Sequence, residues 1–378
     1  MSSVDTMTTR GLDDDIHQGQ VIFITLLICI LWILCILGNV LVCLVIYRSR
    51  RVQSTTNYFI VGLACTDLFF AITTLPSITG TILTGSWNFG DFMCRITRFL
   101  HHVTLGVTDF ILLCICIDRF YTIIYPLTFK VTRSTSKRMI MIACFISVIF
   151  SSFSLYFYGK IDINKNNASY PICPTYMDIN RTQWTGLAYM ISLLLTHYVA
   201  PVIIMLVLYI KVFRYIWRSS GSCLQFQRTM NSVPRTKVKM VRMLMITTVS
   251  NVLLITPVYL LQVMVSLIQP VYVDPYWYVA CILVTFSSSV TKPAIYMCYN
   301  SNFRRGCREV FCMSNMQCYR REAYTITNIS SIGKRNHIGV MNGATQRDSE
   351  SPSHTFDRTI CDEKNKWPLS GSVPSTCV

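Results

Sequence analysis

Charged residues are scarce in this chain of 378 residues. Only 14% of the residues are Asp, Glu, Lys or Arg, and 52% are hydrophobic, whereas a soluble domain normally carries about 25% charged residues. No charged residue occurs from Ile16 to Tyr47, and none occurs between Arg242 and Asp274. A helix crosses the hydrocarbon layer of a membrane with about 20 residues. The shortage of charge therefore argues against a soluble domain and indicates membrane-spanning helices.

Seven apolar blocks are long enough to span a membrane. They lie near residues 21–47, 57–83, 95–124, 138–158, 185–213, 239–268 and 276–299. The first block is far longer than the apolar stretch of 7–15 residues in a signal peptide. Acidic residues, Asp13 to Asp15, precede it in place of lysines. We therefore expect it to be a retained span.

The predicted fold is an all-α membrane protein, a seven-transmembrane helix bundle over residues 21–299. Residues 1–20 form the expected extracellular N-terminus. The segment NSNFRRG begins a short amphipathic helix at residues 300–312. Residues 313–378 are polar and without apolar periodicity, which predicts a disordered cytoplasmic tail.

Basic residues exceed acidic ones, 34 to 18, which gives a formal net charge of +16. In a soluble protein such an excess would suggest nucleic acid, but here the Lys and Arg residues gather in alternate connections between the blocks. Cytoplasmic loops collect Lys and Arg. We therefore expect no nucleic-acid partner, a multi-pass protein of the cell membrane, and an extracellular N-terminus.

Most of the 17 cysteines fall within the spans or on the expected cytoplasmic side, where thiols stay reduced. Cys94 and Cys173 are the two on the oxidising side, and two cysteines allow one disulfide. The loop that contains Cys173 also carries two glycosylation sequons, at Asn167 and Asn180.

Polar residues inside the spans are costly in lipid and tend to mark function. In chain order the landmarks are Gly38-Asn39-Val40, LACTD ending in Asp67, Asp118-Arg119-Phe120, Pro201 with Tyr209, Pro257, and Lys292-Pro293-x-x-Tyr296. This set, distributed in this order along the spans, resembles the rhodopsin-like (class A) G-protein-coupled receptors over about residues 20–312. The resemblance implies a receptor that is not an enzyme and that transmits an extracellular signal to heterotrimeric G proteins.

The same resemblance assigns residues to G-protein coupling: Asp118, Arg119, Phe120, Tyr209 and Tyr296. Arg119 would be held by Asp118 at rest and would meet the G protein when the sixth span swings outward; the alternative is an arginine that only anchors its helix at the headgroups. Many members of the family also hold this arginine through an acidic residue of the sixth span. Lys237 occupies that position, so the resting lock is expected to be weak.

Other switch positions also depart from the family pattern. Ile255 replaces a tryptophan, and Asn251 replaces a phenylalanine. By family position the neighbour of Asn251 on the third span is Asp109, which stands where an apolar residue is usual. These departures support a second hypothesis, a constitutively active or ligand-independent regulatory receptor.

Lys292 stands where the family usually has Asn or Asp, which helps the aspartate of the second span to bind sodium. Here that aspartate is Asp67, and helix depth and side-chain direction predict that the two side chains converge. We expect an ion pair that replaces the sodium ion. Asp109 is the alternative partner, and a lysine that reaches the membrane surface is the other alternative. The expected intramembrane polar core comprises Asn39, Asp67, Asp109, Asn251 and Lys292.

The ligand pocket is expected near three histidines, His101, His102 and His197. His101 occupies the position where amine receptors carry an aspartate, and neutral imidazole is a poor counter-ion for an amine. The alternative is that His101 and His102 are polar lining at the outer mouth of the bundle. They do not form a recognisable metal site, because no HExxH motif is present, and we expect neither metal nor cofactor. The long outer loop is similar to that of peptide receptors, so a secreted peptide is the expected ligand.

The predicted inner partners follow from the end of the chain. Cys312 and Cys318 lie among basic residues, a setting that suits palmitoylation and contact with membrane lipid. Thr376 and Val378 fit a C-terminal ligand for PDZ domains. Arrestin and receptor kinases are implied by the family resemblance. A polytopic transporter is the alternative of a different class, but the sequence has no internal repeats or paired broken helices.

Overall fold

The structure is a computed structural model that describes residues 2–48, 55–84, 86–126, 131–165, 168–174, 179–221, 235–267 and 275–311. Its helices are α1 (Ser2–Arg48), α2 (Thr55–Thr73), α3 (Leu75–Thr84), α4 (Gly90–Ile124), α5 (Arg133–Ser152), α6 (Ser154–Phe157), α7 (Ile179–Leu193), the π-helical segment η2 (Leu194–Val199), α8 (Ala200–Gly221), α9 (Arg235–Leu267), α10 (Pro275–Tyr299) and α11 (Ser301–Phe311). Two antiparallel strands, β1 (Ile161–Lys165) and β2 (Ala168–Ile172), form a hairpin.

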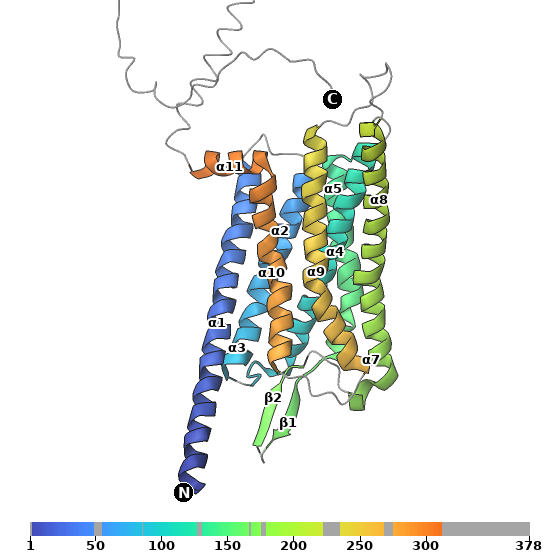
Figure 1. Cartoon of the computed structure of the whole chain (residues 1–378). Coiled ribbons are helices and arrows are strands. Elements are labelled where there is room, and N and C mark those ends of the chain that lie inside the picture. The colour runs from blue at the N-terminus through green and yellow to red at the C-terminus, as the bar shows by residue number, and fades with distance from the viewer. Residues whose placement is uncertain are drawn as a thin grey trace, which may run out of the picture. The chain divides into compact units, whose positions relative to one another are not determined.

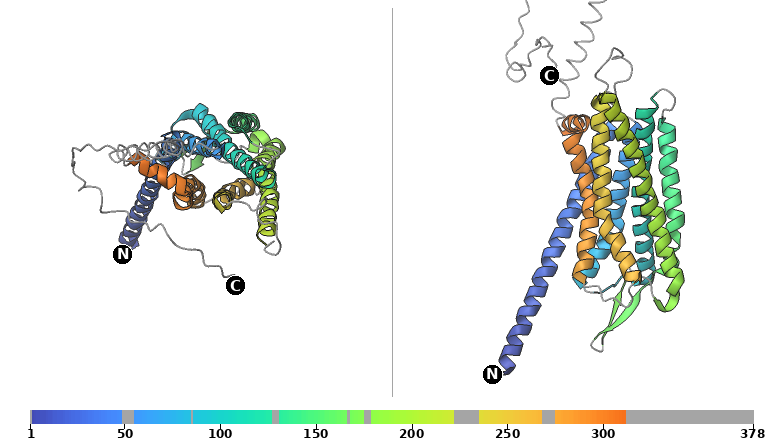
Figure 2. Two further views of the ribbon diagram at one scale, coloured as in Figure 1. Left: turned by 90° about the horizontal axis from the view of Figure 1, so that it is seen from above. Right: turned by 45° about the vertical axis from the view of Figure 1, so that its right-hand side comes forward.

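Seven stretches of helix in the described residues are long and apolar enough to cross a membrane, which confirms the predicted fold. They form an upright bundle, with the hairpin at one end and α11 lying across the other (Figure 1). We call these the hairpin end and the α11 end. Seen along the bundle, the helices are grouped around α4 and its neighbours (Figure 2). α4 packs against α2, α5, α8 and α9, so its side chains form the centre of the core.

Three of the spans are interrupted. Pro76 starts a new helix after Thr74, because proline lacks an N–H and its ring clashes with the carbonyl four residues earlier. The break at Phe153 has no proline; there the hydroxyls of Ser152 and Ser154 bond to carbonyls of the preceding turn, which bends helices. η2 directly precedes Pro201, whose missing N–H leaves a carbonyl without its helical partner.

The first apolar block, predicted near residues 21–47, is found as the span Gly19–Arg48 within the longer helix α1. Two expectations for the connection between the fourth and fifth spans require correction. α7 begins at Ile179, so Asn180 lies in a helix and not in the loop. The connection between the fourth and fifth spans contains the β-hairpin, which the sequence analysis did not predict. Alternating apolar residues in Ile161–Lys165 and the adjacent asparagines of the sequence were the available signals.

Close approach of α1 to α10 explains the glycine of the first landmark. A Cβ atom on Gly38 would lie 3.1 Å from the ring of Pro293.

At the α11 end, Phe303 and Cys307 are buried while Arg304 and Arg305 face outward. The amphipathic helix predicted at residues 300–312 is therefore present, and its apolar side is packed against the bundle.

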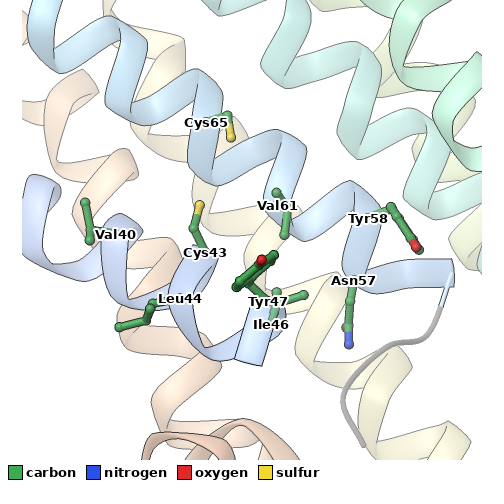
Figure 3. Close-up of a pocket in the computed structure, with 9 residues that line it drawn as sticks. All are labelled: Val40, Cys43, Leu44, Ile46, Tyr47, Asn57, Tyr58, Val61 and Cys65. Atoms are coloured by element: carbon green, nitrogen blue, oxygen red, sulfur yellow. The ribbon is translucent and has the colours of Figure 1, made fainter. Parts of the chain in front are cut away.

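An apolar groove opens on the surface of the bundle between α1 and α2, toward the α11 end (Figure 3). Its volume is about 580 Å³, and Cys43 and Cys65 lie on its two sides. Tyr47 and Asn57 form its polar edge near the ends of the two helices. Because the rest of the lining is apolar, the groove suits membrane hydrocarbon and not a polar ligand.

The hairpin is fastened to the bundle by a disulfide and by backbone bonds. Cys94 of α4 and Cys173, directly after β2, form the predicted disulfide, with their Cα atoms 5.5 Å apart. The amide of Trp87 donates to the carbonyl of Pro171 at 2.6 Å, and the Arg98 guanidinium donates to the carbonyl of Cys173 at 2.6 Å. Gly90, at φ 79°, supplies the left-handed turn into α4.

Removal of this disulfide is expected to reduce stability. Cys94→Ala should lower the stability of the purified protein by about 2–5 kcal/mol, because the bridge closes a long segment of chain, and Cys173→Ala should have the same effect. The double variant should be no less stable than either single variant, because all three lack one bridge. Thermal unfolding measures the change, with Cys29→Ala as the control at a free cysteine. A free thiol at Cys94 or Cys173 in mass spectrometry would contradict the bridge.

Candidate functional site

A lysine–aspartate ion pair lies in the middle of the bundle. Lys292 Nζ of α10 is 2.7 Å from Asp67 Oδ1 of α2, and both side chains are almost completely buried. The hydroxyl of Ser289 also donates to Asp67 Oδ1, at 2.8 Å. The predicted convergence of Asp67 and Lys292 is therefore confirmed. The lysine neither reaches the membrane surface nor pairs with Asp109 in this arrangement.

A small cavity borders the ion pair. Its volume is about 20 Å³, and both Asp67 and Lys292 line it together with Ser289 and Thr108. The second carboxylate oxygen of Asp67, Oδ2, has no hydrogen-bond partner among the described residues. A polar cavity of this size accommodates about one water molecule. The lysine ammonium thus takes the main position beside the carboxylate and leaves little free volume.

Asn39 of α1 connects the first span to this centre. Its amide nitrogen donates to the carbonyl of Ser289 at 3.1 Å and to the carbonyl of Cys35 at 3.0 Å. Ser289 therefore receives a bond from Asn39 through its backbone and gives one to Asp67 through its side chain. Sequence reasoning had not singled out this serine, although it stands three residues before Lys292, where a helix presents the same face.

A second polar pair lies between α4 and α9. Asn251 Nδ2 donates to Asp109 Oδ1 at 3.1 Å, and both side chains are about 1% exposed. The contact confirms that these two unusual residues are neighbours, as their family positions implied. Ile255, one turn further along α9, is 2% exposed and packs with Leu105 of α4. An apolar contact thus replaces the tryptophan expected at that position.

Arg119 is held at the α11 end. Its Nε donates to Asp118 Oδ2 at 3.0 Å, and its Nη2 donates both to Asp118 Oδ2 and to the hydroxyl of Thr56 on α2. Thr56 also donates to Asp118 Oδ2 at 3.3 Å. The contact with α9 is made by the sulfur of Met240, 3.3 Å from Arg119 Nη1. Neither Thr56 nor Met240 belongs to a recognised motif, so no sequence signal pointed to them.

The other residues assigned to coupling contact several helices. Phe120 packs against the cluster of Ile123, Val212 and Val241, which joins α4, α8 and α9. The Tyr209 hydroxyl lies 3.1 Å from that of Thr248 on α9. Tyr296 stacks edge to face with Phe303 of α11, and its buried hydroxyl has no partner among the described residues.

The three histidines are buried on the hairpin side of the ion pair. His102 Nε2 lies 3.2 Å from the Tyr158 hydroxyl, and the His101 ring contacts Phe70, which lines the cavity beside Lys292. His197 packs on Gly106, where a Cβ atom would approach its ring to 2.7 Å. His197 therefore lies about one turn further along α4 than His102. The structure brings the histidines close to one another, but each is covered by aromatic or helical neighbours.

No group of three or more His, Cys, Asp or Glu side chains suited to a metal ion occurs among the described residues. The predicted lipidation sites Cys312 and Cys318, the terminal Thr376 and Val378, and the sequon at Asn167 lie outside the described residues. The tail predicted for residues 313–378 also lies outside them. The backbone of Asn180 lies in α7, as given above.

The buried ion pair predicts a specific pattern of stability changes. Lys292→Ala should lower the stability of the protein by about 3–5 kcal/mol, because it leaves the Asp67 carboxylate buried without its cation. The double variant Asp67→Ala with Lys292→Ala should lose less than Lys292→Ala alone, because no unpaired charge remains. Thermal unfolding of the purified variants measures both, with Lys211→Ala at an exposed lysine as control. A double variant as unstable as the sum of the single ones would contradict the pairing.

The sequence of this chain matches one family of known proteins. Residues 38–296 match the family described as 7 transmembrane receptor (rhodopsin family). The chain is 39% identical to the rat protein named Probable G-protein coupled receptor 19 over 97% of this chain and 87% of the relative.

Two relatives with peptide receptor names also match. The mouse neuropeptide FF receptor 2 is 26% identical over 95% of this chain and 88% of the relative. The trissin receptor of Drosophila melanogaster is 32% identical over 53% of this chain and 30% of the relative. The family match covers the helices that carry the ion pair, the Asp109–Asn251 contact and the Arg119 site. The chain therefore belongs to the rhodopsin family of seven-transmembrane receptors.

Proposed function

We propose that this receptor binds a secreted peptide at the hairpin end and activates a heterotrimeric G protein at the α11 end. The observation on which the proposal rests is the Arg119 site: a buried arginine held by Asp118 and Thr56, with α9 closed over it through Met240. Outward movement of α9 would remove the Met240 contact. Arg119 would then be available to a partner at the α11 end.

The proposed orientation places the N-terminus and the hairpin outside the cell. Support comes from the distribution of Lys and Arg, which gather in the connections at the α11 end. The Cys94–Cys173 disulfide at the hairpin end agrees with an oxidising compartment on that side. Glycosylation at Asn167 and Asn180 belongs to the same proposal.

A peptide ligand is supported by exposed aromatic residues at the hairpin end and by two relatives named as peptide receptors. The hairpin carries the exposed Tyr170, and α7 carries Trp184, which is 79% exposed. Aromatic residues of this kind supply large contact areas in interfaces. Asp162 of the hairpin is paired with Lys160, and Asp91 of α4 is paired with Arg95, so these two carboxylates are already neutralised. We therefore favour a peptide that carries aromatic groups.

A receptor active without ligand is the second candidate, and the contact at Met240 favours it. A methionine sulfur is only a weak acceptor, whereas many family members hold this arginine through a carboxylate on the sixth span. Lys237, at the family's acidic position, is only half-buried and cannot hold Arg119. The resting state is therefore expected to be held less firmly by α9.

The remaining partners are proposed from the sequence and the family. Receptor kinases and arrestin would act on the tail, PDZ domains would bind Thr376 and Val378, and lipid chains on Cys312 and Cys318 would hold the segment after α11 at the membrane. The buried face of α11, with Phe303 and Cys307, agrees with a helix that follows the membrane surface.

The experiment that tests the function measures G-protein activation in cells that express the receptor, first without ligand and then with a panel of secreted peptides. Signal should rise with expression level and rise further with an activating peptide, and Arg119→Ala should abolish both parts. Expression of the variant at the cell surface is the control. Equal background signals from the receptor and from Arg119→Ala, with and without peptides, would refute the proposal.

Sodium should not regulate this receptor, because the Lys292 ammonium already neutralises Asp67. Replacing sodium by a large organic cation at constant ionic strength should leave the thermal stability unchanged. Lys292→Asn should make stability and activity depend on sodium, because it restores an uncharged side chain beside Asp67. A clear sodium dependence of the unmodified receptor would show that the ammonium does not occupy the site.

A further inference from the structure

The middle of the bundle contains more carboxylates than cations. Asp67, Asp109 and Lys292 are each at most 3% exposed. If both carboxyl groups were ionised, two negative charges would face one positive charge in a medium of low dielectric constant. Lys292 Nζ is hydrogen-bonded to Asp67, so the excess charge would fall on Asp109. An unpaired buried charge is strongly disfavoured.

The hydrogen bonds around Asp109 show the same imbalance. Asn251 donates one bond to Asp109 Oδ1. The second oxygen of Asp109, Oδ2, and the amide oxygen of Asn251, Oδ1, are both buried and without a partner among the described residues. Both atoms are acceptors when the aspartate is ionised. Two buried acceptors on two side chains already in contact require one donor.

We propose that Asp109 is a proton-binding site in the resting receptor. A proton on Asp109 Oδ2 turns this atom into a donor, and the acid then pairs with Asn251 through two hydrogen bonds: the amide donates to one carboxyl oxygen, and the acid hydroxyl donates to the amide oxygen. One proton from water thus satisfies both unpaired atoms. It also leaves the middle of the bundle neutral, with Asp67 ionised and Lys292 protonated.

The other titratable groups around Asp109 agree with this assignment. Lys292 of α10 and Tyr259 of α9 interact electrostatically with it. Lys292 alone would favour the ionised carboxylate, but its hydrogen bond goes to Asp67. The phenol of Tyr259 is uncharged at neutral pH and cannot neutralise a carboxylate. The ring of Tyr198 packs against that of Tyr259, and its hydroxyl lies 2.5 Å from that of Thr256.

The acid–amide pair would join α4 to α9 without a net charge. Movement of α9 away from α4 would break both hydrogen bonds at once. Asp109 would then be free to release its proton and to interact with Lys292.

Infrared spectroscopy tests the proposal directly. The purified receptor, in a detergent without ester groups and at neutral pH, should show the carbonyl band of a protonated carboxylic acid, and the band should shift to lower frequency in heavy water. Asp109→Asn should abolish it. Asp118→Asn is the matched control on the same helix: its carboxylate is paired with Arg119, so the band should persist. Absence of the band, or its survival in Asp109→Asn, would overturn the proposal.

A second variant tests the partner of the proton. Asn251→Leu removes the amide, so the carbonyl loses its hydrogen bond and the acid band should move to higher frequency. An unchanged frequency would overturn the acid–amide pair. If Asp109→Asn does not fold, the unmodified receptor is produced in cells supplied with aspartate that carries carbon-13 in its side-chain carboxyl. The label then shows whether the acid band comes from an aspartate. The band should then shift to lower frequency, and a band that does not shift would not come from aspartate.

Discussion

The buried pair of Asp67 and Lys292 constrains the whole centre of this receptor. A single ammonium in the hydrocarbon layer needs a carboxylate, and the one within reach belongs to α2. The pair therefore holds α2 to α10, while Asn39 holds α1 to the same turn of α10 through the carbonyl of Ser289. Because the pair takes the only cation of this layer among the described residues, Asp109 must satisfy its carboxyl group by another route.

α4 carries this constraint to the two ends of the bundle. At the hairpin end it is joined to the hairpin by the Cys94–Cys173 disulfide, and at the α11 end it presents Arg119. Between them Asp109 contacts Asn251 of α9. Two contacts between α4 and α9 are therefore polar but lack an ion pair: Asp109 with Asn251, and Arg119 with Met240. These contacts can break without pulling apart two opposite charges. This agrees with a helix that moves during signalling.

The substituted switch positions gain a physical account from these contacts. Ile255 fills an apolar site beside Leu105, in a cluster that also contains Val258 and Tyr259. Asn251 and Asp109 are both polar and meet each other at 3.1 Å. A single polar residue at either position would have been buried without a partner. The two departures thus compensate for each other, and the fold is retained.

Much of the fold could be predicted from the sequence, because lipid imposes strict rules on charge and length. The seven spans followed from the apolar blocks, the disulfide from the two cysteines on one side, and the Asp67–Lys292 pair from depth and side-chain direction. The hairpin and the early start of α7 were missed, since short alternating segments between long helices are weak signals. The break at Phe153 was missed as well, because serine hydroxyls bend a helix only where they bond to the preceding turn.

Only the tertiary structure decided which polar atoms have partners. The sequence placed Asp109 and Asn251 near one another, but it could not show that one oxygen of each remains without a donor. It also could not show that Thr56 and Met240 complete the Arg119 site, because these residues come from α2 and α9 and belong to no motif. Hydropathy and spacing fix which helices form and how deep each residue lies. Rotation of each helix about its axis, set by packing with its neighbours, decides which side chains meet.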